Sequence, residues 1–93
     1  MFEQRQLKAI FKGNVQGVFF RKHVKKWADK NNVCGYVKNL KDGSVEMIAI
    51  GDKKTLDKLL DEIQKNPGFG SIDSIDKRYS KNFRKFEDFQ ITY

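Results

Sequence analysis

The residues best suited to chemistry lie between Gly13 and Arg21, where a polar loop with two glycines leads into a predicted helix. Glycine can adopt positive φ angles and lets the backbone approach an oxyanion closely, so successive N–H groups of such a loop can surround an anion. Arg21 adds a planar set of donors that fits two oxygens of a phosphate or carboxylate. The pattern therefore predicts an anion site, although an ordinary strand-to-helix loop with a surface arginine shares it.

The first turns of the helix after this loop carry positive charge, which is the reverse of what stabilises a helix. Acidic residues at a helix N-terminus contribute about 0.3–1 kcal/mol each, yet this one begins with Arg21, Lys22 and His23. No Ser, Thr, Asp or Asn stands at the expected N-cap beside Phe19. A bound anion would supply the missing negative charge, so the uncapped start supports the anion site.

A second candidate for chemistry is Asn39, near the end of a predicted strand from Cys34 to Leu40. Val37 is the inward residue of this strand, and side chains two positions apart lie on the same face. Asn39 is therefore expected to point inward, where a polar side chain must find a partner or face a pocket. The alternative is an asparagine that caps the turn after the strand.

The length and the net charge of the chain limit the number of domains and the kinds of partner to expect. Ninety-three residues allow one domain, residues 1–93, and 39% hydrophobic residues with clear periodicity favour a folded globule. The net charge of +7 is uneven: residues 1–46 hold ten Lys or Arg against four Asp or Glu, whereas residues 47–93 hold nine against eight. This field would attract a small anionic substrate, but it would also attract nucleic acid.

Other kinds of site find little support. The apolar runs are too short to cross a membrane, residues 1–6 lack the apolar core of a signal peptide, and one cysteine cannot form an internal disulfide, so a cytoplasmic protein is expected. Cys34 is interpreted as a packing residue. His23 lies about 200° from Arg21 around a helix, so we expect a surface side chain and not a catalytic base. No residues have metal-ligand spacing, and no cofactor is expected.

Hydrophobic periodicity predicts the elements that must position Arg21 and Asn39. Strands are expected at 7–12, 34–40, 45–49, 72–79 and 89–93, with an irregularity in the fourth because Ile72 and Ile75 are three residues apart. Helices are expected from Phe20 to Asn31-Asn32 and from a cap at Asp52 to Pro67-Gly68. This order predicts an α+β, ferredoxin-like split β-α-β sandwich (β-α-β-β-α-β plus a terminal strand), with two helices on one face of an antiparallel sheet.

With these residues assembled, the chain resembles the acylphosphatase family over essentially its whole length. The resemblance rests on the loop from Gly13 to Arg21, which contains Val-Gln-Gly-Val-x-Phe-Arg, and on Gly-x-Val-x-Asn ending at Asn39. Weaker matches are Asp42-Gly43-Ser44-Val45-Glu46, Gly51 and Phe89-Gln90-Ile91-Thr92-Tyr93. The family's fold has strand order 4-1-3-2-5, which agrees with the predicted topology.

The resemblance implies a hydrolase that cleaves the carboxyl–phosphate bond of small acyl phosphates without a metal. Arg21 would hold the phosphate and Asn39 would orient the attacking water. The backbone N–H groups of the phosphate-binding loop would assist Arg21, and these belong to Val15, Gln16, Gly17, Val18, Phe19 and Phe20. Inorganic phosphate or sulfate would compete with substrate, and the protein is expected to be a monomer without a membrane partner.

Two alternatives belong to other classes. RNA-recognition modules share the element order but stack bases on exposed aromatic residues of the central strands, and 45–50 contains none, so nucleic acid is not expected as a partner. A non-catalytic anion-binding domain would not need both Arg21 and Asn39. The departure from the family at Phe69-Gly70-Ser71 leaves the preferred acyl group open.

Overall fold

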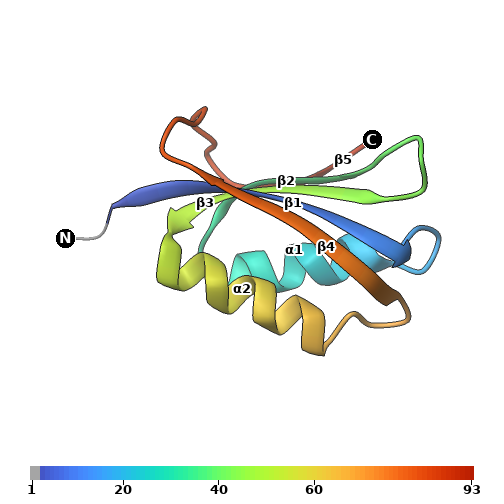
Figure 1. Ribbon diagram of the computed structural model, residues 1–93. Helices are drawn as coiled ribbons and strands as arrows, with labels where there is room; N and C mark the ends of the chain where they lie inside the picture. The colour runs from blue at the N-terminus through green and yellow to red at the C-terminus, as the bar shows by residue number, and fades with distance from the viewer. Residues whose placement is uncertain (1–2) are drawn as a thin grey trace.

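Two helices cover one face of a five-stranded sheet in the computed structural model, which describes residues 3–93 (Figure 1). The helices are α1 (Phe20–Lys30) and α2 (Lys53–Lys65). The strands are β1 (Gln4–Asn14), β2 (Cys34–Asn39), β3 (Val45–Asp52), β4 (Ser71–Ser80) and β5 (Phe89–Thr92). Their order in the sheet is β4-β1-β3-β2-β5, which confirms the predicted ferredoxin-like topology.

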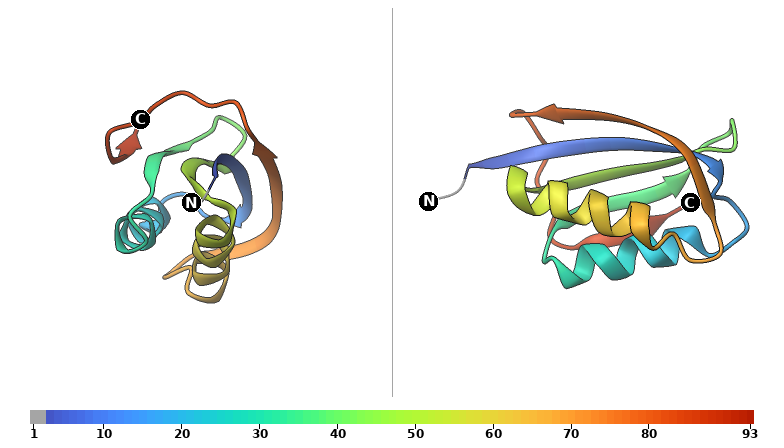
Figure 2. Two further views of the ribbon diagram at one scale, coloured as in Figure 1. Left: turned by 90° about the vertical axis from the view of Figure 1, so that its left-hand side faces the viewer. Right: turned by 60° about the horizontal axis from the view of Figure 1, so that its bottom comes forward.

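The prediction of an antiparallel sheet is correct for the first four strands but wrong for β5, which lies parallel to β2, so the complete sheet is mixed. The direction of β5 follows from the path of the chain. After β4 the chain must travel from one edge of the sheet to the other, and the segment 81–88 crosses at the end of the sheet where β2 begins (Figure 2). The last strand then runs back alongside β2 in the same direction.

The core lies between the helices and the inner face of the sheet. The spacing of Phe20, Val24, Trp27 and Ala28 predicts one apolar stripe on α1, and Phe20, Val24 and Ala28 are buried while Trp27 is only partly buried. Full burial of a side chain such as Phe20 or Val24 contributes about 1.5–3 kcal/mol. The buried stripe of α2 and the inward residues of the sheet complete this core, and they include Leu56, Leu59, Leu60, Ile63, Leu7, Ala9, Phe11, Val37, Val45, Met47 and Ala49.

Strand β3 is buried on both faces. Its inward residues follow the predicted alternation, but the outward Ile48 and Ile50 are also only 6% and 8% exposed. On this outer face Ile50 lies beside Phe83 and Phe86 of the crossing segment 81–88, and Phe86 packs 5.9 Å from the Tyr36 ring of the neighbouring strand. One side of β3 therefore packs against the helices and the other lies beneath the crossing segment.

A bulge in β4 sits beside the start of the glycine loop. Phe11 pairs with Ile75 and Gly13 with Ile72, so the register shifts between Lys12 and Gly13 and confirms the predicted irregularity. Gly13 has φ 139°, and a Cβ there would overlap the Ser71 carbonyl oxygen. Glycine thus lets β4 pair closely with β1 up to the residue before the loop. Within residues 3–93, no helix is long and apolar enough to cross a membrane.

Candidate functional site

Helix α1 begins without a side-chain cap. Its N-cap residue is Phe19, which has the left-handed angles φ 61° and ψ 21° and accepts no capping hydrogen bond through its side chain. The first turn contains no acidic residue. The Phe19 carbonyl accepts from the N–H groups of Lys22 and His23 at 3.1 and 3.3 Å, so the helical bonds start there. The uncapped N-terminus predicted from the sequence is therefore present.

The loop before α1 presents free backbone donors. The N–H groups from Val15 to Arg21 donate no hydrogen bond to any residue in the described part of the chain. Two residues of the loop have left-handed backbone angles, Gly17 with φ 74° and Phe19 with φ 61°. Backbone anion nests are built where left-handed residues follow right-handed ones, so these angles are compatible with such a nest.

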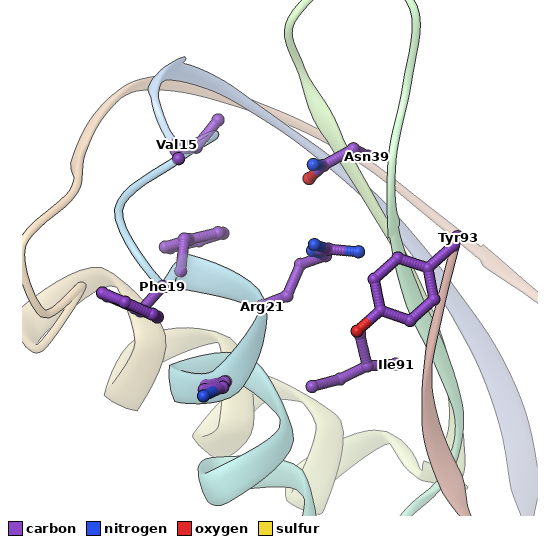
Figure 3. Close-up of a pocket in the computed structure, with 9 residues that line it drawn as sticks. Val15, Phe19, Arg21, Asn39, Ile91 and Tyr93 are labelled. Carbon is purple, nitrogen blue, oxygen red and sulfur yellow. The ribbon is translucent and has the colours of Figure 1, made fainter.

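A pocket of about 250 Å³ opens beside this loop (Figure 3). It lies between the loop, the start of α1, the end of β2 and the C-terminal end of β5. Its lining residues are Val15, Gly17, Phe19, Phe20, Arg21, Lys22, Asn39, Ile91 and Tyr93. Both residues singled out from the sequence for their chemistry, Arg21 and Asn39, therefore line one cavity.

The Arg21 guanidinium is held in this pocket by uncharged partners. Its Nη1 donates to the Thr92 carbonyl at 3.1 Å, and its Cζ lies 4.5 Å from the centre of the Tyr93 ring. Cation–π contacts of this kind orient an arginine without neutralising it. No ion pair joins Arg21 to a carboxylate within residues 3–93. Its positive charge thus remains available to an anion.

The Asn39 side chain points into the same pocket from β2 (Figure 3). Its Oδ1 is buried and has no hydrogen-bond partner among the described residues. A buried polar atom without a partner costs about 1–3 kcal/mol, so this orientation needs an explanation outside the fold. The turn after β2 does not provide one, because Asp42 closes it by accepting from the Ser44 N–H at 2.9 Å. The hydrogen bond from the Ser44 hydroxyl, with that N–H, lowers the pKa of Asp42.

Two loop residues turn their side chains away from the pocket. The Gln16 amide nitrogen donates to the carbonyls of Leu40 and Ser44, both at 2.8 Å, and so ties the loop to the turn between β2 and β3. Val18 packs against the hydrophobic core. These two positions can face an anion only through their backbone, whereas Val15, Gly17, Phe19 and Phe20 line the cavity itself.

Three lining residues were not anticipated from the sequence, namely Lys22, Ile91 and Tyr93. The sequence contained enough information to place Ile91 and Tyr93. The alternation of Phe89, Ile91 and Tyr93 predicted the last strand, and the expected strand order placed it beside the strand that carries Asn39. Reading those two features together would have brought the end of β5 to the pocket.

The remaining candidates lie elsewhere. The His23 ring packs on Gly68, in the loop after α2, and does not line the pocket. Cys34 is a partly exposed free thiol at the opposite end of β2 from Asn39. Within residues 3–93 no group of three or more His, Cys, Asp and Glu side chains is placed to hold a metal ion.

Comparison with known proteins gives a consistent answer. A family model described as acylphosphatase matches residues 7–91. An acylphosphatase of Dehalococcoides mccartyi (strain CBDB1) is 36% identical over 88 residues, covering 94% of this chain and 97% of the relative. One from Bacillus licheniformis is 38% identical over 88 residues, covering 95% and 98%.

Solved structures agree with the sequence relatives. The crystal structure of acylphosphatase from Bacillus subtilis matches with a TM-score of 0.91 at 34% identity, over 96% of this chain and 99% of that one. Full-length HypF, in its phosphate- and nucleotide-bound form, matches with a TM-score of 0.89 at 27% identity, over all of this chain but only 12% of its own length. The relationship supports a hydrolase, and the chain belongs to the acylphosphatase family.

Proposed function

We propose that this protein is an acylphosphatase that hydrolyses the carboxyl–phosphate bond of small acyl phosphates, yielding a carboxylate and inorganic phosphate. In this proposal the backbone N–H groups of residues 15–20 and the Arg21 guanidinium bind the phosphoryl group, and Asn39 orients the attacking water. In this proposal the protein acts as a monomer.

One observation carries the proposal. A buried amide oxygen without a partner, that of Asn39, faces the same cavity as an arginine that has no carboxylate partner in the described chain. An unpaired acceptor and an unpaired cation would each be costly if the pocket had only a structural role. A phosphoryl group beside Arg21 and a water hydrogen-bonded to Asn39 would satisfy both.

The chemistry needs positioning more than a strong nucleophile, because an acyl phosphate is an activated anhydride. Water attacks phosphorus, a bond forms between its oxygen and phosphorus, and the bond from phosphorus to the acyl oxygen breaks with its electron pair leaving on the carboxylate. A proton of the water passes to a phosphoryl oxygen. Arg21 and the loop amides stabilise the phosphoryl oxygens throughout, in a geometry fixed before substrate arrives.

Asn39 suits the water because a side-chain amide offers both a donor and an acceptor. Its buried Oδ1 would accept a hydrogen bond from the water and so direct an oxygen lone pair toward phosphorus. Arg21 suits the phosphoryl group because its planar donors match two oxygens at once.

The decisive test is hydrolysis of acetyl phosphate by the purified protein and two variants. Arg21→Gln should lose both turnover and inhibition by inorganic phosphate. Asn39→Ala should lower kcat by about 10²–10³-fold, the usual cost of removing one positioned polar group, while phosphate inhibits it as it does the wild type. If Asn39→Ala weakens phosphate inhibition and turnover equally, the water-orienting role is wrong.

A further part of the proposal is that the reaction needs no metal, since Arg21 and the loop amides already supply positive potential at the phosphoryl oxygens. Dialysis against EDTA should then leave kcat unchanged. Activity that disappears with EDTA and returns with a divalent cation would contradict this part alone.

A further inference from the structure

The phosphate-binding loop has little within itself to fix its shape. The N–H groups from Val15 to Arg21 donate no hydrogen bond to any residue in the described part of the chain. A backbone without internal hydrogen bonds keeps one conformation only where neighbouring segments hold it. The two hydrogen bonds from the Gln16 side chain hold the loop to the turn after β2. Any other support must come from the segments that pack against the loop.

One such segment is the turn between α2 and β4, residues 66–70, which lies at the same end of the sheet as the loop (Figure 2). Its shape is tight, because the Gly70 N–H donates to the Pro67 carbonyl at 3.2 Å. Strand β4 then begins at Ser71, which pairs with Asn14, the last residue of β1. None of residues 66–70 lines the pocket, so this segment supports the loop from outside the site.

Gly70 lies so close to the loop that no side chain fits between them. A Cβ on Gly70 would lie 2.9 Å from the Asn14 carbonyl oxygen and 3.4 Å from Cγ2 of Val18. The Asn14 oxygen belongs to the backbone, so it could make room only if the start of the loop moved. The φ angle of Gly70 is not positive. Glycine is therefore needed here for close approach and not for backbone freedom.

A further contact reaches the first turn of α1. The half-buried His23 ring packs on Gly68, and a Cβ there would overlap it. Residues 66–70 thus contact the chain at three places along the anion site. They touch Asn14 before the loop, Val18 within it and His23 after it.

We infer that the segment 66–70 is a positioning element for the phosphate-binding loop, and that Gly70 is its critical residue. Gly70 does not touch the phosphoryl group. Its contacts with Asn14 and Val18 fix the direction of the loop amides, so that several donors meet the phosphoryl oxygens at once. The inference rests on the proposed function and adds to it a residue outside the pocket.

The test compares Gly70→Ala with a matched control, Gly51→Ala. Gly51 also has no positive φ, and a Cβ there would lie 3.3 Å from Cγ1 of Val33, far along the chain from the loop. Gly70→Ala should raise the inhibition constant of inorganic phosphate and KM for acetyl phosphate by about tenfold, the usual cost of one hydrogen bond to a charged group. Its kcat should change by less than about threefold, because Asn39 stays in place. Gly51→Ala should leave both constants within about twofold of the wild type, whatever its Tm.

Two further variants give an answer even if Gly70→Ala does not fold. His23→Ala removes the contact on Gly68 and adds no bulk, and it should raise the phosphate inhibition constant by about twofold to fivefold. Phe69→Ala alters a side chain of the same segment that is 80% exposed, and it should change neither constant.

An unchanged phosphate inhibition constant in folded Gly70→Ala, or in His23→Ala where Gly70→Ala does not fold, would overturn the positioning role and leave the proposed function standing. A Gly51→Ala variant that weakens phosphate inhibition as much as Gly70→Ala would also overturn it, since the loss would then follow from stability and not from position. A wild type that does not hydrolyse acetyl phosphate would overturn the proposed function itself.

Discussion

The two helices lie side by side on one face of the sheet, yet their N-termini are built in opposite ways. The N-cap of α2 is Asp52, with φ −75° and ψ 154°, and it accepts from the Thr55 N–H at 3.1 Å and the Thr55 hydroxyl at 2.7 Å. The N-cap of α1 is the left-handed Phe19, which caps nothing. Neither first turn contains an acidic residue. The difference therefore lies in the cap, and only α2 obtains its negative charge from the chain.

This contrast separates stability from function within one small fold. The α2 terminus satisfies its donors internally, as most helices do. The α1 terminus leaves its donors open beside an arginine without a carboxylate partner in the described chain, and it therefore meets the requirements of an anion. A cap on α1 would strengthen the helix and fill the site.

Inorganic phosphate should stabilise the protein through α1. At about 100 times its dissociation constant, a ligand adds about 2.7 kcal/mol, which raises Tm by more than about 10 °C in a domain of this size. Arg21→Gln should abolish the increase, and Asp52→Ala should retain it from a lower starting Tm. Thermal unfolding by circular dichroism measures both. An increase that survives Arg21→Gln would mean that phosphate binds elsewhere.

A carboxylate placed beside the α1 terminus should compete with the anion. Phe19→Asp should raise the inhibition constant of phosphate by about tenfold at low salt, since charges a few ångströms apart at a protein surface interact by about 1–4 kcal/mol. Phe19→Asn is the neutral control of the same shape. The difference between the phosphate inhibition constants of Phe19→Asp and Phe19→Asn should decrease as the salt concentration increases. Equal phosphate inhibition of both variants at low salt would contradict an anion site beside residue 19.

The hydrogen bonds from Gln16, which join the loop to the turn after β2, should increase both stability and turnover. Gln16→Leu removes the donor to the carbonyls of Leu40 and Ser44 and should lower the free energy of unfolding by about 1–2 kcal/mol. It should also lower kcat, because the loop and Asn39 lose their common anchor. Gln90→Leu is the control, since Gln90 is exposed and its side chain bonds only to Asp88 within residues 3–93. A Gln16→Leu variant with unchanged urea unfolding would show that the tie is dispensable.

The cap of α2 should affect stability alone, by the smallest amount of the four. The hydrogen bond from the Thr55 hydroxyl, with that from its N–H, lowers the pKa of Asp52. A lowered folded pKa means that its contribution is present above the ordinary value of about 3.9 and is lost as pH falls through the folded pKa. Asp52→Ala should thus lower Tm by a few degrees at pH 7. The difference in Tm between the wild type and Asp52→Ala should disappear in acid. A difference that grows as the pH falls would contradict the capping role of Asp52.

Local features of the site were predictable from the sequence, because they depend on residues adjacent in the chain. The uncapped start of α1, the position of Arg21 and the inward direction of Asn39 follow from cap chemistry and strand alternation. The Asp52 cap and the irregularity of β4 were visible for the same reason. Each of these predictions needed a window of only a few residues.

Features that depend on distant segments were not predictable in this way. The outward Ile50 is buried beside Phe83 and Phe86 of the crossing segment 81–88, and the strand's own pattern does not contain that information. The Gln16 side chain follows no period, so its turn away from the pocket depended on where the carbonyls of Leu40 and Ser44 lay. Ile91 and Tyr93 reach the pocket through the pairing of β5 with β2, which the expected strand order supplied and no local window of the sequence contained.

The hydrogen bond from Arg21 to the Thr92 carbonyl joins residues 71 positions apart. Because closing so long a loop is slow compared with forming a helix, we expect this contact to form late, when non-local strands pair. During refolding, helical signal and burial of tryptophan should therefore return before turnover does. Recovery of the enzymatic rate would then report when β5 pairs with β2, so activity itself would measure the last step in forming the sheet.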